Sequence, residues 1–367
     1  MDQLRRYLTE VADCFHPERF SYPGFALALA IGGIGGWIFW LLQLPLPWML
    51  GSMVFCTLAA VAGVRIESPV IIRRPTVSII SVMLGAAFTP QLLASLWTWF
   101  PTIIGLSVST ILSGIVCVAY FRYVAGFNAP TAYFSGMPGG VVEMVMLGEQ
   151  YKADVHRIAL VQASRILILV FALPFIVQMM LGISLGQRPP VGQSVLETPF
   201  SSYVLLIFCA VVGYHIGPKL NFPAPPFTGP LFVSGLLHVL GLTDFKPATE
   251  IVIVAQVILG GYIGTSFRGV SPAEFVRTLA TGMGAAGLLL VTTITVAYIT
   301  SLVSRYEMIP LLLAFSPGGV IEMSLIALAL HIEVAFVACH HLMRVLIVIG
   351  GAAIGFEWLT GRKRQQN

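Results

Sequence analysis

The chain has 367 residues, of which 57% are apolar and 10% are charged, and its formal net charge is +4. Soluble domains carry about 25% charged and 45–50% apolar residues, so much of this surface must face hydrocarbon. The composition excludes a cytosolic enzyme, a secreted module and a disordered scaffold, and it predicts an all-α, polytopic transmembrane bundle.

Residues 1–23 precede the first apolar run and carry apolar side chains at helical spacing. We expect this N-terminal segment to be a short interfacial helix, with an ordinary cytosolic tail as the alternative. Acidic residues are spread through it, and the run that follows has membrane length. That run is therefore expected to be a spanning helix rather than the core of a cleaved signal peptide.

Apolar runs of membrane length follow in two groups of five, since a spanning helix needs roughly 20 such residues. The predicted spans are 24–43, 46–63, 76–97, 101–121 and 155–181, and then 202–218, 224–241, 250–267, 278–303 and 333–356. A shorter apolar stretch precedes the fifth span of each group, at 138–148 and 309–330. A polar linker at 182–201 separates the groups, and a basic tail occupies 358–367.

The two groups are related by an internal repeat. The block Pro-Gly-Gly-Val-Val-Glu-Met at 138–144 returns at 317–323, with six of its seven positions identical and an offset of 179 residues. The pattern Leu-x-x-Pro-x-Pro-x-x-x-Gly at 42–51 returns at 220–229 with an offset of 178. Two blocks in the same order in each half predict a duplication, with membrane repeats at 24–181 and 202–357.

The orientation of the halves depends on whether the Pro-Gly-Gly segments cross the membrane. If they are re-entrant, each half has five spans and the halves are inverted; if they span, each half has six and the halves are parallel. Lysine and arginine favour the cytoplasmic side. With cytoplasmic termini, the first arrangement places 15 of these residues inside and 3 outside, whereas the second gives 13 against 5. We therefore expect two inverted repeats of about five spans, each with a re-entrant half-helix.

Short helices interrupted by Gly and Pro, at matching positions of inverted halves, are the best sequence indication of a transport site. The free N–H groups of such a half-helix carry partial positive charge and can receive an anion or a polar solute. A tight helix crossing without any ligand is the alternative. The predicted substrate-binding residues are Pro138, Gly139, Gly140, Glu143, Gln162 and Arg165 in the first half, and Pro317, Gly318, Gly319, Glu322, His341 and Arg344 in the second.

Four of these residues are ionisable and lie deep in apolar sequence: Glu143, Arg165, Glu322 and Arg344. A charge at the bilayer centre costs at least about 2.5–3.5 kcal/mol, so each should face a partner or a wet cavity. One interpretation is a Glu–Arg salt bridge within each half. The other treats the glutamates as proton or cation sites and the arginines as anchors for an anionic substrate. Both arginines are expected roughly 16 Å into the membrane.

The histidines and cysteines indicate less. His340 precedes Arg344 by four residues, so the two can share a helix face, and a proton relay competes there with simple packing. No histidines cluster with cysteines or carboxylates at ligand spacing, and we expect neither a metal nor a cofactor. The five cysteines are scattered singly and are expected to be small core residues.

The blocks PGGVVEM and PGGVIEM, with LPLPWMLG near the start and VQASR and HHLMR further on, resemble the AbrB duplication family of bacterial integral membrane proteins over about 24–357. The resemblance implies a multi-pass protein of the bacterial inner membrane, and the distribution of basic residues adds the expectation that both termini are cytoplasmic. The labels used for the family imply regulation of gene expression or ammonia monooxygenase activity. A direct DNA-binding regulator would need a basic soluble module, and a copper or iron monooxygenase would need clustered ligands. The residues supply neither.

From these patterns we expect a secondary transporter of a small polar or anionic solute, coupled to protons or sodium at the interface of the repeats. Its partners are the lipid bilayer and the small-molecule or ion substrate, without direct nucleic-acid binding, and a homo-oligomer is left open. One alternative is a membrane-bound regulator that changes gene expression indirectly. The less favoured alternative is a monooxygenase-like enzyme.

Overall fold

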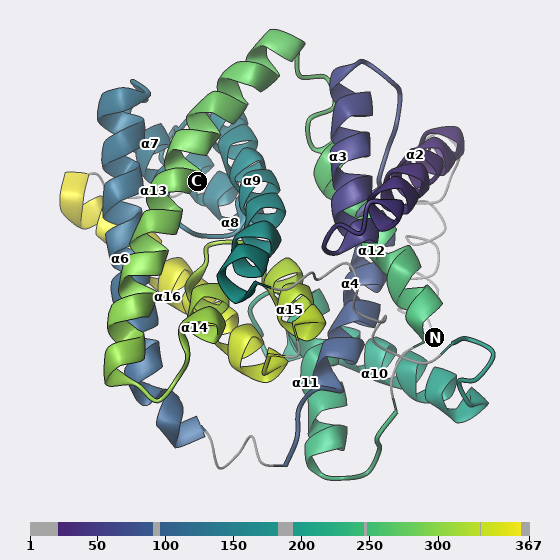
Figure 1. Ribbon diagram of the computed structural model, residues 1–367. Coiled ribbons are helices and arrows are strands. Elements are labelled where there is room, and N and C mark those ends of the chain that lie inside the picture. The colour runs from purple at the N-terminus through teal and green to yellow at the C-terminus, as the bar shows by residue number, and fades with distance from the viewer. Residues whose placement is uncertain (1–20, 91–95, 183–193, 246–247, 331, 361–367) are drawn as a thin grey trace, which may run out of the picture.

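The computed structural model describes residues 21–90, 96–182, 194–245, 248–330 and 332–360 (Figure 1). These ranges contain fourteen α-helices and no strand, so the all-α fold class is confirmed. The predicted N-terminal segment 1–23, the linker 182–201 and the tail 358–367 lie largely outside the described residues.

The helices of the two halves correspond in order. The first half supplies α2 (Tyr22–Leu41), α3 (Pro47–Val61), α4 (Val70–Gly85), α6 (Phe100–Ala119), α7 (Ala129–Gly136), α8 (Val141–Gln150) and α9 (Val155–Leu181). The second half supplies α10 (Phe200–Lys219), α11 (Pro225–Val239), α12 (Thr249–Thr265), α13 (Pro272–Val303), α14 (Met308–Phe315), α15 (Val320–Ala329) and α16 (Val334–Thr360). Short turns of helix, η1 (Leu96–Trp99) and η2 (Tyr120–Val124), extend α6 at its two ends.

Six helices in the described ranges are long and apolar enough to cross a membrane: α2, α6 with its extensions, α9, α10, α13 and α16. They coincide with six of the ten predicted spans. The other four spans coincide with α3, α4, α11 and α12, which have 15, 16, 15 and 17 residues. A helix of this size reaches roughly 23–26 Å, slightly less than the hydrocarbon core of about 30 Å.

Some helix bounds differ from the prediction for local reasons. The span predicted at 76–97 is a helix that begins at Val70, directly after Pro69, and ends at Gly85. The span predicted from 278 begins at Pro272, because Ser271 caps the helix by accepting a hydrogen bond from the Glu274 N–H.

A further helix, α7, occupies residues 129–136, where the sequence predicts none. Asn128 caps it by accepting from the Thr131 N–H. The shorter stretch predicted at 138–148 is therefore only the second arm of a two-helix unit. In the second half, the stretch predicted at 309–330 holds both corresponding helices, α14 and α15.

The helices pack as two bundles, and each bundle draws on both halves of the chain (Figure 1). The first bundle contains α2, α3, α4, α10, α11 and α12, in which α3 packs on α12 and α4 packs on α11. The second bundle contains α6 to α9 and α13 to α16, in which α13 packs on α6 and α9. The bundles meet where α4 contacts α15 and α16, and where α9 contacts α3 and α12.

Close helix contacts in the first bundle depend on glycine. A Cβ atom on Gly51 would collide with the backbone of Gly35, and one on Gly229 would collide with Gly213. These pairs join α2 to α3 and α10 to α11 at corresponding places. In lipid there is no hydrophobic driving force for helices to associate, so they depend on close van der Waals packing. Small residues allow that close approach.

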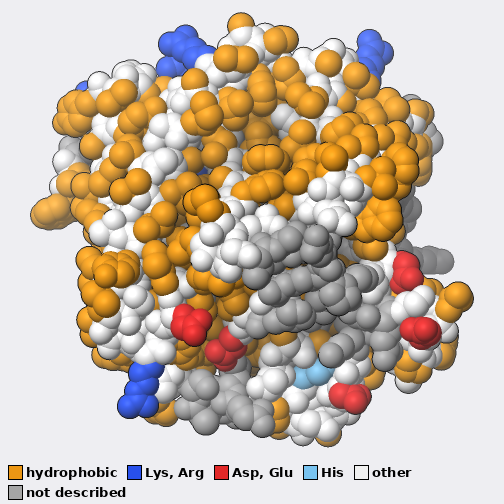
Figure 2. All heavy atoms as spheres, in the orientation of Figure 1, with side chains coloured by type: hydrophobic (Ala, Val, Ile, Leu, Met, Phe, Trp, Pro, Cys, Tyr) orange, Lys and Arg blue, Asp and Glu red, His pale blue; other side chains and the backbone are white. Residues whose placement is uncertain are grey.

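The surface matches a chain surrounded by lipid. Figure 2 shows apolar side chains over most of the visible face, with Lys and Arg mainly at its upper edge and Asp and Glu towards its lower edge. Large exposed apolar residues occur along the long helices, among them Trp37, Ile115, Phe208 and Val291. Such residues would be costly on a surface in contact with water.

Candidate functional site

Each Pro-Gly-Gly segment forms the turn of a helical hairpin. Residues 137–140 join α7 to α8, and residues 316–319 join α14 to α15. Beside the start of α7, Thr131 Oγ1 accepts from the Asp154 N–H, at 2.9 Å, just before α9. Beside the start of α14, the ring of Tyr306 stacks on Phe336 in the first turn of α16, at 4.5 Å between centroids. Each hairpin therefore opens at the beginning of the long helix that follows it.

The two hairpins approach the middle of α6 from its opposite ends. Phe127, directly before α7, stacks on Phe121 near the η2 end of α6, with centroids 5.4 Å apart. Phe336, beside the start of α14, contacts Trp99 at the other end, at 5.5 Å. Further in, Met137 and Pro138 of the first hairpin turn lie beside Gly114 of α6, and the ring of Phe315, the last residue of α14, lies beside Gly105. Nine residues of helix separate those glycines, which corresponds to roughly 13 Å.

Arg165 on α9 caps the last turn of α7. Its Nη1 donates to the Met137 carbonyl at 3.1 Å and its Nη2 to the Gly139 carbonyl at 2.8 Å. Arg344 on α16 caps α14 in the same way, donating to the carbonyl of Ser316 and, at 2.8 Å, to that of Gly318. Both arginines are only 4% exposed. The end of a helix leaves carbonyl groups free and carries partial negative charge, so a cation is favourable there.

Gln162 and His341 each bind a carbonyl group one turn further back. Gln162 Nε2 donates to the Phe134 carbonyl and His341 Nε2 donates to the Leu313 carbonyl, both at 2.9 Å. Because a carbonyl oxygen only accepts, Nε2 of His341 carries its proton. The remaining polar atoms, Gln162 Oε1 and His341 Nδ1, are buried without a hydrogen-bond partner, as are the Nε atoms of both arginines. Buried polar atoms are nearly always paired, so these four indicate a place for water or a ligand.

Glu143 and Glu322 lie in the first turns of α8 and α15 and fold back over the beginning of each helix. A Cβ atom at the preceding N-cap residue, Gly140 or Gly319, would collide with the Oε2 atom of the glutamate. Glycine therefore leaves room for a carboxylate where the helix offers free N–H groups and partial positive charge. Glu322 is buried, whereas Glu143 is half-buried, so the expectation of a deeply buried acid holds only in the second half.

The interpretation of a Glu–Arg salt bridge within each half is wrong. Neither Glu143 nor Glu322 pairs with an arginine; each carboxylate lies over a helix N-terminus, while each guanidinium binds carbonyl groups across the break. Among the described residues, ion pairs join His156 to Glu274, Arg157 to Asp154, and Arg268 to Glu67.

His340 does not lie on the face of α16 from which Arg344 binds the hairpin turn. Its Nε2 lies 2.8 Å from Thr102 Oγ1 on α6, and its Nδ1 lies 2.8 Å from the Phe336 carbonyl. Since that carbonyl only accepts, Nδ1 carries a proton. The histidine that binds a carbonyl group of the hairpin is His341, which occupies the position that Gln162 holds in the first half.

The α15 hairpin faces the first bundle. Arg73 on α4 lies within electrostatic reach of Glu322, and its guanidinium also stacks over the ring of Tyr262 on α12, 4.6 Å from the centroid. Arg165 and Arg344 lie within electrostatic reach of each other. Glu322 and the two arginines therefore lie on helices that meet the first bundle, because α15 and α16 contact α4 while α9 contacts α3 and α12. Arg73 is a site residue that the sequence analysis missed.

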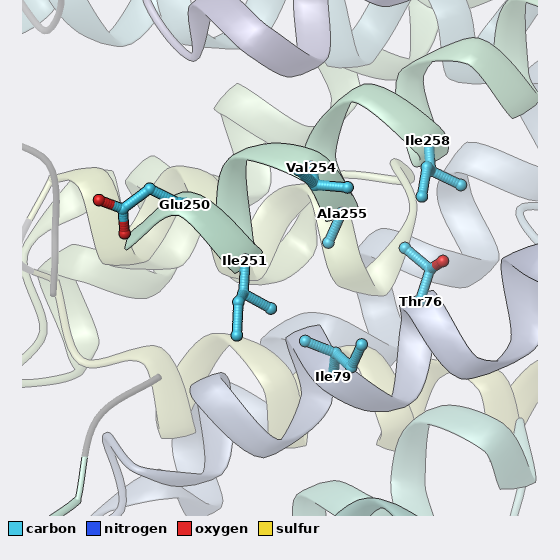
Figure 3. A pocket seen from close by; sticks show the side chains of 7 residues that line it. All are labelled: Thr76, Ile79, Glu250, Ile251, Val254, Ala255 and Ile258. Carbon is cyan, nitrogen blue, oxygen red and sulfur yellow. The ribbon is translucent and has the colours of Figure 1, made fainter. Parts of the chain in front are cut away.

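A separate apolar hollow of about 280 Å³ lies between α4 and α12 (Figure 3). Apolar side chains of the two helices face each other across it, while Glu250 lies at one end with its carboxylate turned outward. None of the predicted site residues lines this hollow, and its residues are Thr76, Ile79, Glu250, Ile251, Val254, Ala255 and Ile258. Across the described ranges, no three His, Cys, Asp or Glu side chains lie close enough to hold a metal ion.

Comparison with known proteins matches this chain along most of its length. A family model described as "Transition state regulatory protein AbrB" matches residues 48–360. The Bacillus subtilis (strain 168) protein YhjN is 25% identical over 347 residues, covering 88% of this chain and 89% of that protein. The Escherichia coli (strain K12) protein named "Putative regulator AbrB" is 24% identical over 332 residues, covering 90% and 93%. The family match includes both hairpins.

Proposed function

This chain belongs to the AbrB family, and we propose that it is a secondary transporter of a small polar or anionic solute, with an ion- or proton-coupled site where its two hairpins meet. The observation that carries the proposal is the repeated broken helix. Each copy has a buried arginine on its turn and a carboxylate at the start of its second arm. Helices broken at matching places in two halves are the arrangement by which many transporters hold solutes near the bilayer midplane.

In this proposal the hairpins are re-entrant and the halves are inverted. The contacts of Phe127 and Phe336 at opposite ends of α6 support this arrangement. The six long helices and the four shorter ones would then give ten spans, with the termini in the cytoplasm of a bacterial cell. Arg122, Arg157 and Arg268 would lie inside and Arg305 outside, as the preference of basic residues for the cytoplasm favours.

The two bundles supply the parts that could move. Alternating access in such transporters is largely a rocking of one bundle against the other around a fixed site. Here the charged groups lie at the contact between bundles, where α15 and α16 meet α4. Glu322 on α15 is the carboxylate available there to a coupling proton or sodium ion, and Glu143 is its counterpart on α8.

Uptake of labelled solutes into proteoliposomes tests the proposal. Glu143→Gln and Glu322→Gln should each abolish flux driven by a proton or sodium gradient. Glu274→Gln is the matched control, because Glu274 forms an exposed pair with His156 and such pairs contribute little. Flux that is unchanged in both hairpin variants would refute the coupling role of these two carboxylates, whereas the absence of flux of any solute through the unaltered chain would refute the transport function.

A membrane-bound regulator that acts indirectly on gene expression is the second candidate, and the printed name of the Escherichia coli relative is what favours it. A regulator would keep its transcriptional effect in the Glu143→Gln and Glu322→Gln variants and would carry no flux. We assign no reaction chemistry to the chain. Copper or iron bound to the purified protein would instead favour the monooxygenase alternative.

A further inference from the structure

We infer that the solute is a small monocarboxylate that binds at the N-terminus of α15, in the place that the Glu322 carboxylate holds in this structure. The inference rests on the proposed function, because it names the solute class of the same site. As the solute binds, the Glu322 side chain leaves the helix N-terminus and turns towards Arg73 on α4. No covalent bond changes in this exchange of one carboxylate for another.

The charges around the α15 hairpin are unbalanced. Arg165 and Arg344 are buried, each resting on carbonyl dipoles without a carboxylate partner. Arg73 adds a third positive charge near the same place, and Glu322 is the acid among them. A buried guanidinium without a counter-charge is costly, and the helix N-terminus adds further positive potential. An additional anion would therefore be stabilised here.

Unpaired polar atoms mark where that anion would be held. Arg344 Nε and Ser316 Oγ are both buried without a partner; Ser316 belongs to the turn that leads into α15, and Arg344 reaches this turn from α16 by donating to the Ser316 carbonyl. Arg344 also donates to the carbonyl of Gly318, the residue before the N-cap Gly319. A guanidinium N–H and a hydroxyl group beside free backbone N–H groups form a set of donors suited to a carboxylate.

The shape of the site favours a carboxylate over other anions. Gly319 has no Cβ atom, and the carboxylate of Glu322 occupies the space that a Cβ atom would fill. A solute carboxylate has the same planar shape and charge, so it can replace Glu322 without leaving the helix N-terminus unsatisfied. The displaced side chain would gain a charge partner in Arg73.

The α8 hairpin lacks part of this set. Val252 stands at the position that corresponds to Arg73, 179 residues further along the chain. Glu143 is half-buried, so its carboxylate is already partly solvated. The imbalance of buried charge is therefore greater at α15, which is where we place the solute.

Equilibrium binding to the purified full-length chain in lipid nanodiscs tests the inference. The probes are formate, acetate, pyruvate and lactate, with methylammonium as a cationic control. We expect one or more of the carboxylates to bind, Glu322→Ala to tighten that binding about tenfold by removing the competing group, and Arg344→Lys to weaken it about tenfold or more. Arg73→Gln should weaken it as well. Arg277→Gln, an exposed change on α13, should leave it unaltered.

Three results would overturn the inference: no carboxylate binding below about 10 mM, saturable binding of methylammonium, or weaker carboxylate binding in Glu322→Ala. If Glu322→Ala does not fold, Glu322→Gln serves instead, since a neutral amide competes less well for a helix N-terminus. Carboxylate binding without flux would contradict the transport function and leave this inference intact. Flux of another solute, with no inhibition by any carboxylate, would contradict this inference and leave the transport function intact.

Discussion

Arg165 and Arg344 stand 179 residues apart and donate to carbonyl groups that are also 179 residues apart, in two different hairpins. Met137 and Ser316 supply equivalent carbonyl groups although their side chains differ in size and polarity. The contact is made with the backbone, so it does not itself require a particular side chain at either position. Positions 165 and 344 do require arginine, because one side chain must donate to two carbonyl groups at once.

Arg165→Lys and Arg344→Lys should each lower the free energy of unfolding by about 1–3 kcal/mol. A lysine is a compact point charge and cannot bind two separated carbonyl groups in the fixed geometry of a guanidinium, so one buried carbonyl loses its partner. The measurement is the unfolding midpoint of the purified chain in detergent. Arg277→Lys, on the exposed side of α13, is the control, and equal midpoints for all three variants would contradict the capping role.

Gly319→Ala should cost about 0.5–1 kcal/mol in the otherwise unchanged chain, because the new methyl group displaces the Glu322 carboxylate from the helix N-terminus. The same change should cost much less in a Glu322→Ala background, where the colliding atoms are absent. A double-mutant cycle measures that difference. Equal costs in the two backgrounds would show that the glycine serves another purpose.

Gly287→Ala provides the control for the glycine experiment. Nothing lies within 4 Å of a Cβ atom at this position on α13. Alanine is a better helix former than glycine by about 1 kcal/mol, so this change should stabilise the chain slightly. Opposite signs for Gly287→Ala and Gly319→Ala would separate local collision from helix propensity.

His341→Gln should leave stability within about 0.5 kcal/mol, whereas His341→Leu should cost about 1–3 kcal/mol. The first half already uses Gln162 to donate to the carbonyl equivalent to that of Leu313, so an amide at position 341 can keep the hydrogen bond. Leucine would leave a buried carbonyl without its donor. Similar losses in both variants would mean that the ring itself, and not its N–H, is required.

The sequence predicts most of the helices and the importance of both hairpin turns. Apolar length locates the spans, and the repeated Pro-Gly-Gly block locates the breaks, because these signals are local. One of the two interpretations, the pairing of Glu143 with Arg165, fails for a non-local reason. In the structure each charged group is satisfied by a different helix end, and the free N–H and carbonyl groups of those ends are backbone atoms that residue types do not reveal.

Arg73 could not be assigned from the sequence for a related reason. Its neighbours there, Ile72 and Arg74, indicate only the beginning of a span, and its counterpart Val252 carries no charge. Arg73 joins the site because α4 packs against α15, a contact between the first half and the second. The grouping of helices into two bundles, each drawn from both halves, is likewise set by tertiary packing.

The inverted arrangement predicts where four single cysteines will be labelled in a cysteine-free background. Arg122 and Glu149 flank the first hairpin, and Arg305 and Glu333 flank the second; all four are exposed in the structure. If both hairpins are re-entrant, the two members of each pair lie on one side of the membrane, and the two pairs lie on opposite sides. A membrane-impermeant maleimide should then label Arg305→Cys and Glu333→Cys in intact spheroplasts, and Arg122→Cys and Glu149→Cys only in inverted vesicles. If a hairpin spans the membrane instead, its two flanking cysteines will be labelled from different sides, and the solute site would have to be sought elsewhere.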